Sequence, residues 1–387
     1  MRGNRASYMS VAVALLLAQT VCIGAQSEFG AKMQAAAAAE NTAPSPHRIL
    51  FSGHSLTNEP IPSDLTSIAA SLGLNVLWNR QYLEGSSIKQ RSLGLALYNA
   101  RLTSDSQGLD YLNRPIDVPS ELRRPSRHPD QPYDTLVITE QHNLLGTLAW
   151  NGTVRYLRDY HDEFIKHNSD GRTYFFEPWL SLDDKGDPSR WIAYERAAAP
   201  VWRCIVEQMN RVFVAEGRRD RMVSLPAALA LAYLIERAAP HGPGLPSITR
   251  STMRSTLDSL FVDDVHLTRL GNYYIALVTF AYMFRKSPVG AWHPADVNIE
   301  QAKALQDVAA TVTGVPQPAA MPIAACRDYV LRSFMWTYLS YSDVTHWRKE
   351  RAYFRYYIRF KFAAQWFWLF SRDTSKNPFT DAAYKRP

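Results

Sequence analysis

The sequence is short of the residue types from which metal sites are built. It has three cysteines in 387 residues, and no Cys/His cluster has the spacing of zinc ligands. Long apolar runs are scarce: even in the aromatic C-terminal part, the uncharged stretch Phe362–Ser371 is too short to span a membrane. No internal repeat is visible. The sequence therefore predicts no metal, no cofactor and no repeat architecture.

Acidic residues are scarce in the last part of the chain. Residues 327–387 carry 12 Lys/Arg and 5 Asp/Glu, whereas the rest has 31 of each and is neutral, so the net charge of +7 belongs to this segment. A composition of 46% apolar and 20% charged residues excludes a disordered chain. The length suffices for one large core, or for one core with an appendage.

Residues 1–25 have the three-part pattern of a secretory signal peptide. Two arginines precede the apolar run Val11–Leu17, and small residues follow, with cleavage expected after Gly24 or Ala25. The alternative is a single membrane anchor, for which the uncharged run Ala6–Ser27 is long enough. We prefer cleavage, because the apolar centre is short and rich in alanine, and we expect an exported protein, periplasmic or secreted.

Residues 26–47, rich in alanine and proline, are expected to be a flexible linker. Cys22 is expected to leave with the signal peptide, so Cys204 and Cys326 remain. Two cysteines in an exported protein can form one disulfide, but their positions in the sequence do not establish that they meet.

Short apolar runs alternate with helical periodicity between residues 48 and 290. The polar, proline-bearing stretch 100–133 is expected to be a long loop or an irregular insertion, and no hairpin signal is evident. This alternation predicts an α/β domain, a three-layer sandwich around a parallel sheet of about five strands covered by helices on both faces. The strands are expected at Arg48–Ser52, Leu74–Trp78, Thr135–Thr139, Thr173–Phe176 and Met222–Leu225.

Ser55 follows the first of these strands and is the candidate nucleophile. Gly53 permits a sharp turn, and the backbone N–H of Ser55 can itself face an oxyanion. Gly-x-Ser alone is a weak signal, because a serine at this place also commonly caps the helix that follows.

Asp263 and His266 are the candidate orienting carboxylate and general base. A separation of three residues lets a carboxylate in a turn hold the imidazole N–H and set its tautomer. Asp264 is the alternative orienter, although the spacing favours Asp263. The same pattern also occurs in ordinary surface loops that precede a helix.

Candidate oxyanion donors follow three different strands of the predicted sheet. They are the backbone N–H groups of Ser55 and Gly85, and a side-chain amide of Gln141 or Asn143. Because ligands collect at the carboxyl ends of parallel strands, these residues and the Asp263–His266 loop are expected at one edge of the sheet. This shared placement is a stronger argument than any single motif.

Three segments together resemble the SGNH (GDSL-like) hydrolase superfamily. Gly53-His54-Ser55-Leu56 resembles its first block, Glu84-Gly85-Ser86-Ser87 its second, and Asp263-Asp264-Val265-His266-Leu267 its Asp-x-x-His-Leu segment. The resemblance covers roughly residues 48–286 in the family's block order. It implies a serine esterase with Ser55, His266 and Asp263 as the catalytic triad.

The third block departs from that pattern. The family usually ends this strand with Gly-x-Asn-Asp, whereas this chain has Thr139-Glu140-Gln141-His142-Asn143. Gln141 is the first choice for the missing amide donor and Asn143 the second. Glu177-Pro178-Trp179, at another strand end, either lines the acyl or sugar site or packs beneath a loop.

Residues 291–387 are expected to be a helical extension with an aromatic and basic end. Four arginines, 348, 351, 355 and 359, recur at helical spacing among many aromatic residues. The segment is interpreted either as a helix docked on the main domain with a solvated arginine face, or as a contact for a membrane surface or an anionic polysaccharide. No nucleic-acid partner is expected.

The sequence thus predicts an exported serine esterase that removes a small acyl group, acetate by family habit, from a carbohydrate or another ester. The alternatives are an O-acyltransferase that acts on an extracellular polysaccharide, and a non-catalytic protein of the same fold that binds carbohydrate or membrane.

Overall fold

A computed structural model describes residues 46–93, 107–123, 133–240, 244–314 and 319–385. The expected signal peptide and nearly all of the expected linker lie outside the described residues.

A seven-stranded sheet forms the centre of the fold, with strand order β4-β3-β2-β1-β5-β6-β7. Five neighbouring strands, β2, β1, β5, β6 and β7, are parallel to one another. β3 pairs antiparallel with the free edge of β2, and β4 pairs antiparallel with β3. The strands are β1 His47–Gly53, β2 Val76–Tyr82, β3 Gln107–Asp110, β4 Pro115–Asp117, β5 Thr135–Thr139, β6 Arg172–Phe176 and β7 Met222–Leu225.

The predicted strands β1, β5, β6 and β7 are confirmed within one residue at each end, and β2 lies a few residues later than expected. β1 is central, because it pairs with both β2 and β5, and Ile49 and Leu50 are fully buried. Continuous apolar runs predict such strands well, since a parallel strand covered on both faces has no solvent side to alternate with.

The prediction of a purely parallel sheet of about five strands is wrong. Within 100–133, which was expected to be irregular, β3 and β4 form a hairpin. Its turn is held by Asp110, whose carboxylate accepts the N–H groups of Leu112 and Arg114, and Asn113 has a positive φ of 58°. Strands of three or four residues have too little alternation to be recognised; here β3 pairs with the edge of β2, and β4 pairs with β3.

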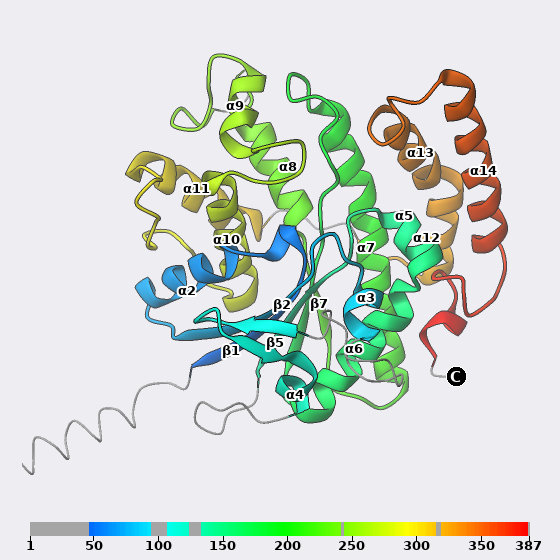
Figure 1. The fold of residues 1–387 in the computed structure, drawn as a ribbon, viewed down its shortest axis with the longest axis horizontal. Coiled ribbons are helices and arrows are strands. Elements are labelled where there is room, and N and C mark those ends of the chain that lie inside the picture. The colour runs from blue at the N-terminus through cyan, green and yellow to red at the C-terminus, as the bar shows by residue number, and fades with distance from the viewer. Residues whose placement is uncertain (1–45, 94–106, 124–132, 241–243, 315–318, 386–387) are drawn as a thin grey trace, which may run out of the picture. The chain divides into compact units, whose positions relative to one another are not determined.

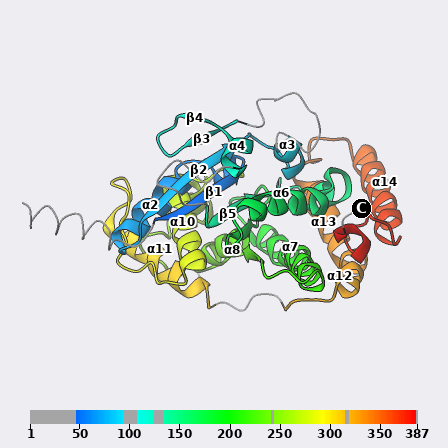
Figure 2. The ribbon, with the colours of Figure 1, turned by 90° about the horizontal axis from the view of Figure 1, so that it is seen from below.

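Helices pack on both faces of this sheet, as Figures 1 and 2 show. In β6, Tyr174 donates a hydrogen bond to the Met283 carbonyl in α10, whereas the next residue, Phe175, packs against Trp202 of α7 with ring centroids 5.3 Å apart. α2 packs on α10, and α6 reaches the sheet through Tyr160, which bonds Gln81 of β2. Successive residues of a strand point to opposite faces, so α10 and α7 cover different faces.

Helices alternate with the parallel strands and follow one another after β7. They are η1 Ser55–Thr57, α2 Ile61–Ser71, α3 Ile88–Leu93, α4 Val118–Arg123, α5 Leu144–Gly146, η3 Thr147–Asn151, α6 Thr153–His167, α7 Ser189–Ala215, α8 Ala227–Arg237, α9 Met253–Leu260, α10 Arg269–Phe284, α11 Ile299–Val312, α12 Ile323–Tyr329, η4 Val330–Phe334, α13 Met335–Val344, α14 Ala352–Phe370 and η5 Asp381–Tyr384.

The C-terminal helices are joined to the rest of the fold by covalent and aromatic contacts. A disulfide links Cys204 in α7 to Cys326 in α12, across 122 residues of sequence. Tyr341 of α13 stacks on Tyr194 of α7 with ring centroids 4.7 Å apart. Within the described parts of the chain, no helix combines the length and the apolar character needed to cross a bilayer.

Candidate active site

The turn after β1 presents Ser55 at the carboxyl end of the central strand. No residue larger than glycine fits at position 53, because a Cβ there would overlap the Thr57 hydroxyl. His54 is buried, with Nε2 3.0 Å from the Glu140 carbonyl oxygen and Nδ1 3.4 Å from the Leu56 N–H. These two bonds are satisfied together when Nε2 carries the proton. Ser55 then begins η1 with its side chain partly exposed.

Ser55, His266 and Asp263 form a continuous hydrogen-bonded chain. The His266 Nε2 atom lies 3.1 Å from the Ser55 Oγ atom, although 211 residues separate them in sequence. The other ring nitrogen, Nδ1, lies 2.7 Å from Asp263 Oδ2. An imidazole between a hydroxyl and a carboxylate is the arrangement that activates a serine for nucleophilic attack.

Backbone donors hold the Asp263 carboxylate in place. Its Oδ1 atom accepts the N–H groups of Val265 at 2.8 Å and His266 at 2.6 Å. Partial burial acts to raise the pKa of Asp263, but these bonds and the imidazole outweigh it, so the pKa lies below its usual value. The carboxylate therefore stays ionised while it orients His266. Asp264, the alternative orienter, instead offers its carbonyl to the Leu182 N–H at 2.7 Å.

The loop that carries Asp263 and His266 is supported from below by Trp179. This tryptophan is buried, and its indole N–H donates to the Val265 carbonyl at 2.8 Å. The segment Glu177-Pro178-Trp179 thus packs beneath a loop, which was one of the two interpretations of its sequence.

Gln141 and Asn143, the two candidate amide donors, have different surroundings. The Asn143 Oδ1 atom accepts a hydrogen bond from the Tyr338 hydroxyl of α13, so this side chain is tied to the C-terminal helices. The Gln141 side chain is partly exposed and makes no side-chain hydrogen bond to the described residues. Gly85 occupies an exposed turn with φ of +59°, and its loop adjoins β1 through the Leu83 N–H, 3.2 Å from the Gly53 carbonyl.

A buried arginine joins the loops that surround Ser55. Arg91 is fully buried, and its guanidinium donates to the Ser52 hydroxyl at 3.0 Å, to the Ser86 carbonyl at 2.9 Å and to the Thr139 carbonyl. It thereby connects the ends of β1 and β5 with the loop after β2. Burial lowers the pKa of Arg91 to about 10, so it remains a cation at neutral pH.

Glu140 is the carboxylate that faces this cation. It is also fully buried, and it accepts hydrogen bonds from the Ile88 N–H at 3.0 Å, the Gln141 N–H at 2.7 Å and the Thr153 hydroxyl at 2.8 Å. Burial raises the pKa of Glu140, while Arg91 and these donors act in the opposite direction. The hydrogen bond from the Gln141 backbone N–H to Glu140 helps to fix the backbone position of Gln141.

Further histidines lie near the triad: the rings of His54 and His142 have centroids 6.3 Å apart, and His142 lies near His266 and His346. Burial, with the nearby Arg91, lowers the pKa of His54 to about 3, and burial lowers that of His142 to about 4. His54 and His142 therefore stay neutral at physiological pH. The histidine bonded to the Ser55 hydroxyl is His266. Among the described residues, no group of three or more His, Cys, Asp or Glu side chains is arranged to hold a metal ion.

The buried His54 makes the stability of the fold depend on pH. Its folded pKa of about 3 lies below the ordinary 6.5, so between these values the unfolded chain binds a proton that the folded chain does not. We expect the free energy of unfolding to fall between pH 7 and pH 5, by up to about 2 kcal/mol from His54. Urea denaturation at several pH values should show a shallower fall for His54→Gln than for the wild type. An unchanged slope in His54→Gln would contradict this assignment.

The comparisons with known proteins assign no family. No protein-family model and no curated protein matches the sequence. A solved structure of a DUF4886 family protein from Bacteroides uniformis is similar over 71% of this chain and 98% of its own, with 13% identity and a TM-score of 0.48. At that level of similarity, neither a family nor an activity follows.

The structure adds residues to this region that the motifs did not indicate. Arg91, Glu140 and Tyr338 make the buried contacts described above, and His142 lies near His266 and His346. The only signal for Glu140 was its place at a strand end. Arg91 and Tyr338 lie outside every recognised block, so their sequence context pointed only to ordinary helix residues.

Proposed function

We propose that this chain is an exported serine esterase that removes a small acyl group, acetate being the simplest, from a carbohydrate. The observation that carries the proposal is the hydrogen-bonded chain from Asp263 through His266 to Ser55. Its place at the carboxyl end of a central parallel strand is where α/β folds gather their ligands. We further propose that the domain is a three-layer α/β/α sandwich of the SGNH type.

The catalytic cycle follows from the positions of these atoms. Ser55 Oγ attacks the ester carbonyl carbon while His266 Nε2 takes the hydroxyl proton, and Asp263 stabilises the imidazolium. The tetrahedral intermediate collapses when His266 returns the proton to the leaving sugar oxygen, and an acyl-serine remains. Water then attacks with His266 again as the base, releasing the carboxylic acid and restoring Ser55.

The exposure of the site supports a large substrate. The side chains of His266 and Asp263 are 43% and 49% exposed, so the reacting atoms lie near the surface rather than in a deep pocket. A polymer that carries acyl groups can reach such a site. If a sugar hydroxyl replaces water in the second step, the same acyl-enzyme makes the protein an O-acyltransferase.

Export is supported by the disulfide between Cys204 and Cys326, because such bonds persist in oxidising compartments. The signal-like pattern of residues 1–25 points the same way.

The proposal is tested by trapping the nucleophile. A fluorophosphonate probe should label the protein once, and peptide mass spectrometry should place the adduct on Ser55. Labelling should disappear in Ser55→Ala and fall strongly in His266→Ala, since the imidazole activates the hydroxyl. Labelling at another serine, or unchanged labelling of His266→Ala, would overturn it.

Gln141 is expected to supply the side-chain donor of the oxyanion hole. The side-chain amide of Gln141 makes no hydrogen bond within the described structure, whereas the Asn143 side chain accepts one from Tyr338. We expect Gln141→Ala to lower kcat about 100-fold or more with little change in stability. Asn143→Ala and Tyr338→Phe should instead each cost about 1 kcal/mol of stability with a smaller change in kcat.

Steady-state kinetics and urea denaturation of the three variants separate these roles. A larger loss of kcat in Asn143→Ala than in Gln141→Ala would reverse the assignment.

A further inference from the structure

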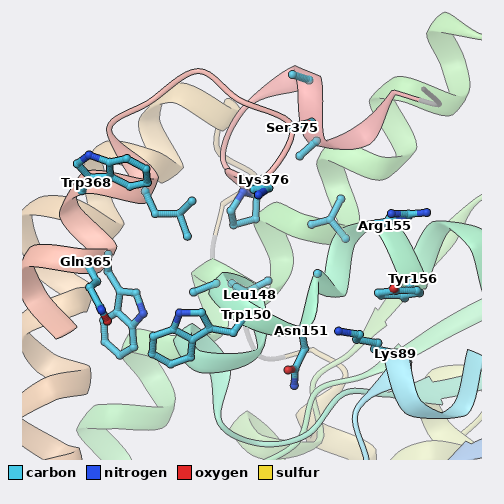
Figure 3. A pocket seen from close by; sticks show the side chains of 18 of the residues that line it. Lys89, Leu148, Trp150, Asn151, Arg155, Tyr156, Gln365, Trp368, Ser375 and Lys376 are labelled. Carbon is cyan, nitrogen blue, oxygen red and sulfur yellow. The ribbon is translucent and has the colours of Figure 1, made fainter. Parts of the chain in front are cut away.

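A large cavity lies between the start of α6 and the C-terminal segment, apart from the triad (Figure 3). Its volume is about 1240 Å³. Its walls come from Lys89 in α3, residues 148–156, residues 364–369 of α14 and residues 375–385.

The lining of this cavity is cationic. Lys89, Arg155, Lys376 and Lys385 line it, and no Asp or Glu is among its described lining residues. The three lysines form no ion pair within the described parts of the chain, and only Arg155 has a carboxylate nearby, Asp159 at 3.8 Å. Such a surface attracts a ligand that carries several negative charges.

The cavity is also lined by tryptophans. Trp150 and Trp368 line the cavity and are 50% and 56% exposed. Arg372 lies over one face of the Trp368 ring, 3.7 Å from its centroid, and Trp150 packs against Phe362 and Trp366, so each ring keeps only part of its surface for a ligand. Trp366 also lines it and is buried, but its indole N–H has no hydrogen-bond partner in the described structure. This N–H is itself covered by protein, so Trp366 contributes to the packing of the cavity wall rather than a donor to a ligand.

The cavity is connected to the candidate active site by short segments. α5 and η3 run from Asn143 directly to Asn151 in the cavity wall, a path of roughly 12 Å at 1.5 Å per residue. Lys89 lies at the start of α3, just after Ser86, which Arg91 binds.

We propose that this cavity binds an acidic stretch of the same polysaccharide whose acyl ester is cleaved at Ser55. Uronate carboxylates pair with the lysines, and sugar rings lie on the exposed parts of Trp150 and Trp368. The inference rests on the proposed function for its link to Ser55, while the binding itself does not require turnover. It names the substrate class as an acidic rather than a neutral glycan.

The test is calorimetric titration of the full chain carrying Ser55→Ala, so that binding is measured without turnover. Oligogalacturonate should bind, and a neutral glucose oligomer of equal length should bind at least about tenfold more weakly. Lys376→Glu and Trp368→Ala should each weaken oligogalacturonate binding at least about tenfold, because both positions are exposed on the cavity wall. Lys303→Glu, on the exposed face of α11, is the matched control and should bind as before.

Equal affinity for the neutral oligomer would overturn the inference. So would unchanged oligogalacturonate binding in both Lys376→Glu and Trp368→Ala. Binding that follows the cavity variants in a protein that never releases acetate would keep the binding site and reject the esterase. Inorganic phosphate at millimolar concentration that displaces the oligomer completely would reduce the cavity to a simple anion site and also overturn the glycan assignment.

The outward face of α14 carries a separate feature. Tyr353, Tyr356, Tyr357, Phe360 and Phe367 are 85%, 71%, 52%, 76% and 56% exposed, and their spacing places them on one stripe of the helix. Soluble proteins rarely expose so much contiguous apolar surface without a partner.

The charges around this stripe indicate which partner. No Asp or Glu occurs from Arg351 to Arg372, whereas Arg359 and Lys361 lie within the helix. Arg355 is bound by Asp343 of α13, which holds α14 and leaves the stripe outside. We propose that α14 lies on an anionic bilayer surface, with its aromatic side chains in the headgroup region and its cations on the phosphates.

Vesicle sedimentation of the full chain tests this second inference. Vesicles with phosphatidylglycerol should bind the protein more tightly than vesicles of phosphatidylcholine alone, and Tyr356→Glu and Phe360→Glu should each weaken binding at least about tenfold. Ile299→Glu, which changes a 66% exposed residue of α11, is the control. Absence of vesicle binding, or a dimer in light scattering that Phe360→Glu abolishes, would overturn it.

Discussion

Ser55→Ala is expected to lower kcat for a chromogenic acetate ester by at least about 1000-fold. In the proposed mechanism, the Ser55 hydroxyl, 3.1 Å from His266 Nε2, is the group that becomes acylated, and alanine has no hydroxyl to replace it. His266→Ala should lose about as much, and the double variant should lose little more, because the two residues act as one unit. Asp263→Asn should lose less, since this carboxylate is 49% exposed and water can partly replace it.

The measurement is initial-rate hydrolysis by residues 26–387, with circular dichroism to show that each variant is folded. Ser67→Ala is the matched control, because the Ser67 hydroxyl bonds only the Ser63 carbonyl within α2. If Ser55→Ala retains turnover, Ser55 is not the nucleophile. If every folded protein lacks turnover, hydrolysis gives way to acyl transfer, which the same assay detects when an acceptor sugar is added.

Arg91→Met is expected to cost about 3–5 kcal/mol of folding free energy, the largest stability effect among these predictions. Arg91 is fully buried, and its removal leaves Glu140 without its cation and the Ser86 and Thr139 carbonyls without a donor. The loss comes from buried polar groups that are left without this donor, and from a buried carboxylate that loses a nearby positive charge. Activity should also fall, since three loops around Ser55 lose their common contact.

Urea denaturation measures this loss of stability, and two further variants serve as comparisons. Arg254→Met, which removes an arginine that is 61% exposed and bound to Asp184, should change stability by less than about 1 kcal/mol. Combining Arg91→Met with Glu140→Gln should recover part of the loss, because the buried charge is then removed. A cost below about 1 kcal/mol for Arg91→Met would mean that water reaches Glu140 and that the arginine does not hold the loops together.

The local chemistry around His266 could be predicted from the sequence because it depends on a single turn. Asp263 and His266 are three residues apart, and a turn at that spacing is enough to bring a carboxylate to an imidazole. Ser55 was likewise predictable, since Gly53 ends an apolar strand and the next residues must turn. The strands β1, β5, β6 and β7 followed from apolar runs that only a doubly covered strand accommodates.

The surroundings of Ser55 depend instead on contacts between distant residues. Tyr338 reaches Asn143 across 195 residues, and Cys204 meets Cys326 across 122. Neither pairing leaves a local signal, because each depends on how the C-terminal helices pack on α7 rather than on propensity or periodicity. The hairpin of β3 and β4 is similar: its strands are too short to be recognised from sequence, and β3 is recognisable only once the edge of β2 is present to pair with it.

The sequence by itself therefore determined the main parallel strands and the residues that meet as Ser55, His266 and Asp263. The tertiary structure alone decided how those residues are supported, through the buried Arg91 and Glu140, and which side chains face the cavity beside α6. The physical reason is one of range. A turn and an apolar run are properties of neighbouring residues, whereas the hydrogen bonds of a buried arginine and the wall of a cavity exist only once separate segments have packed together.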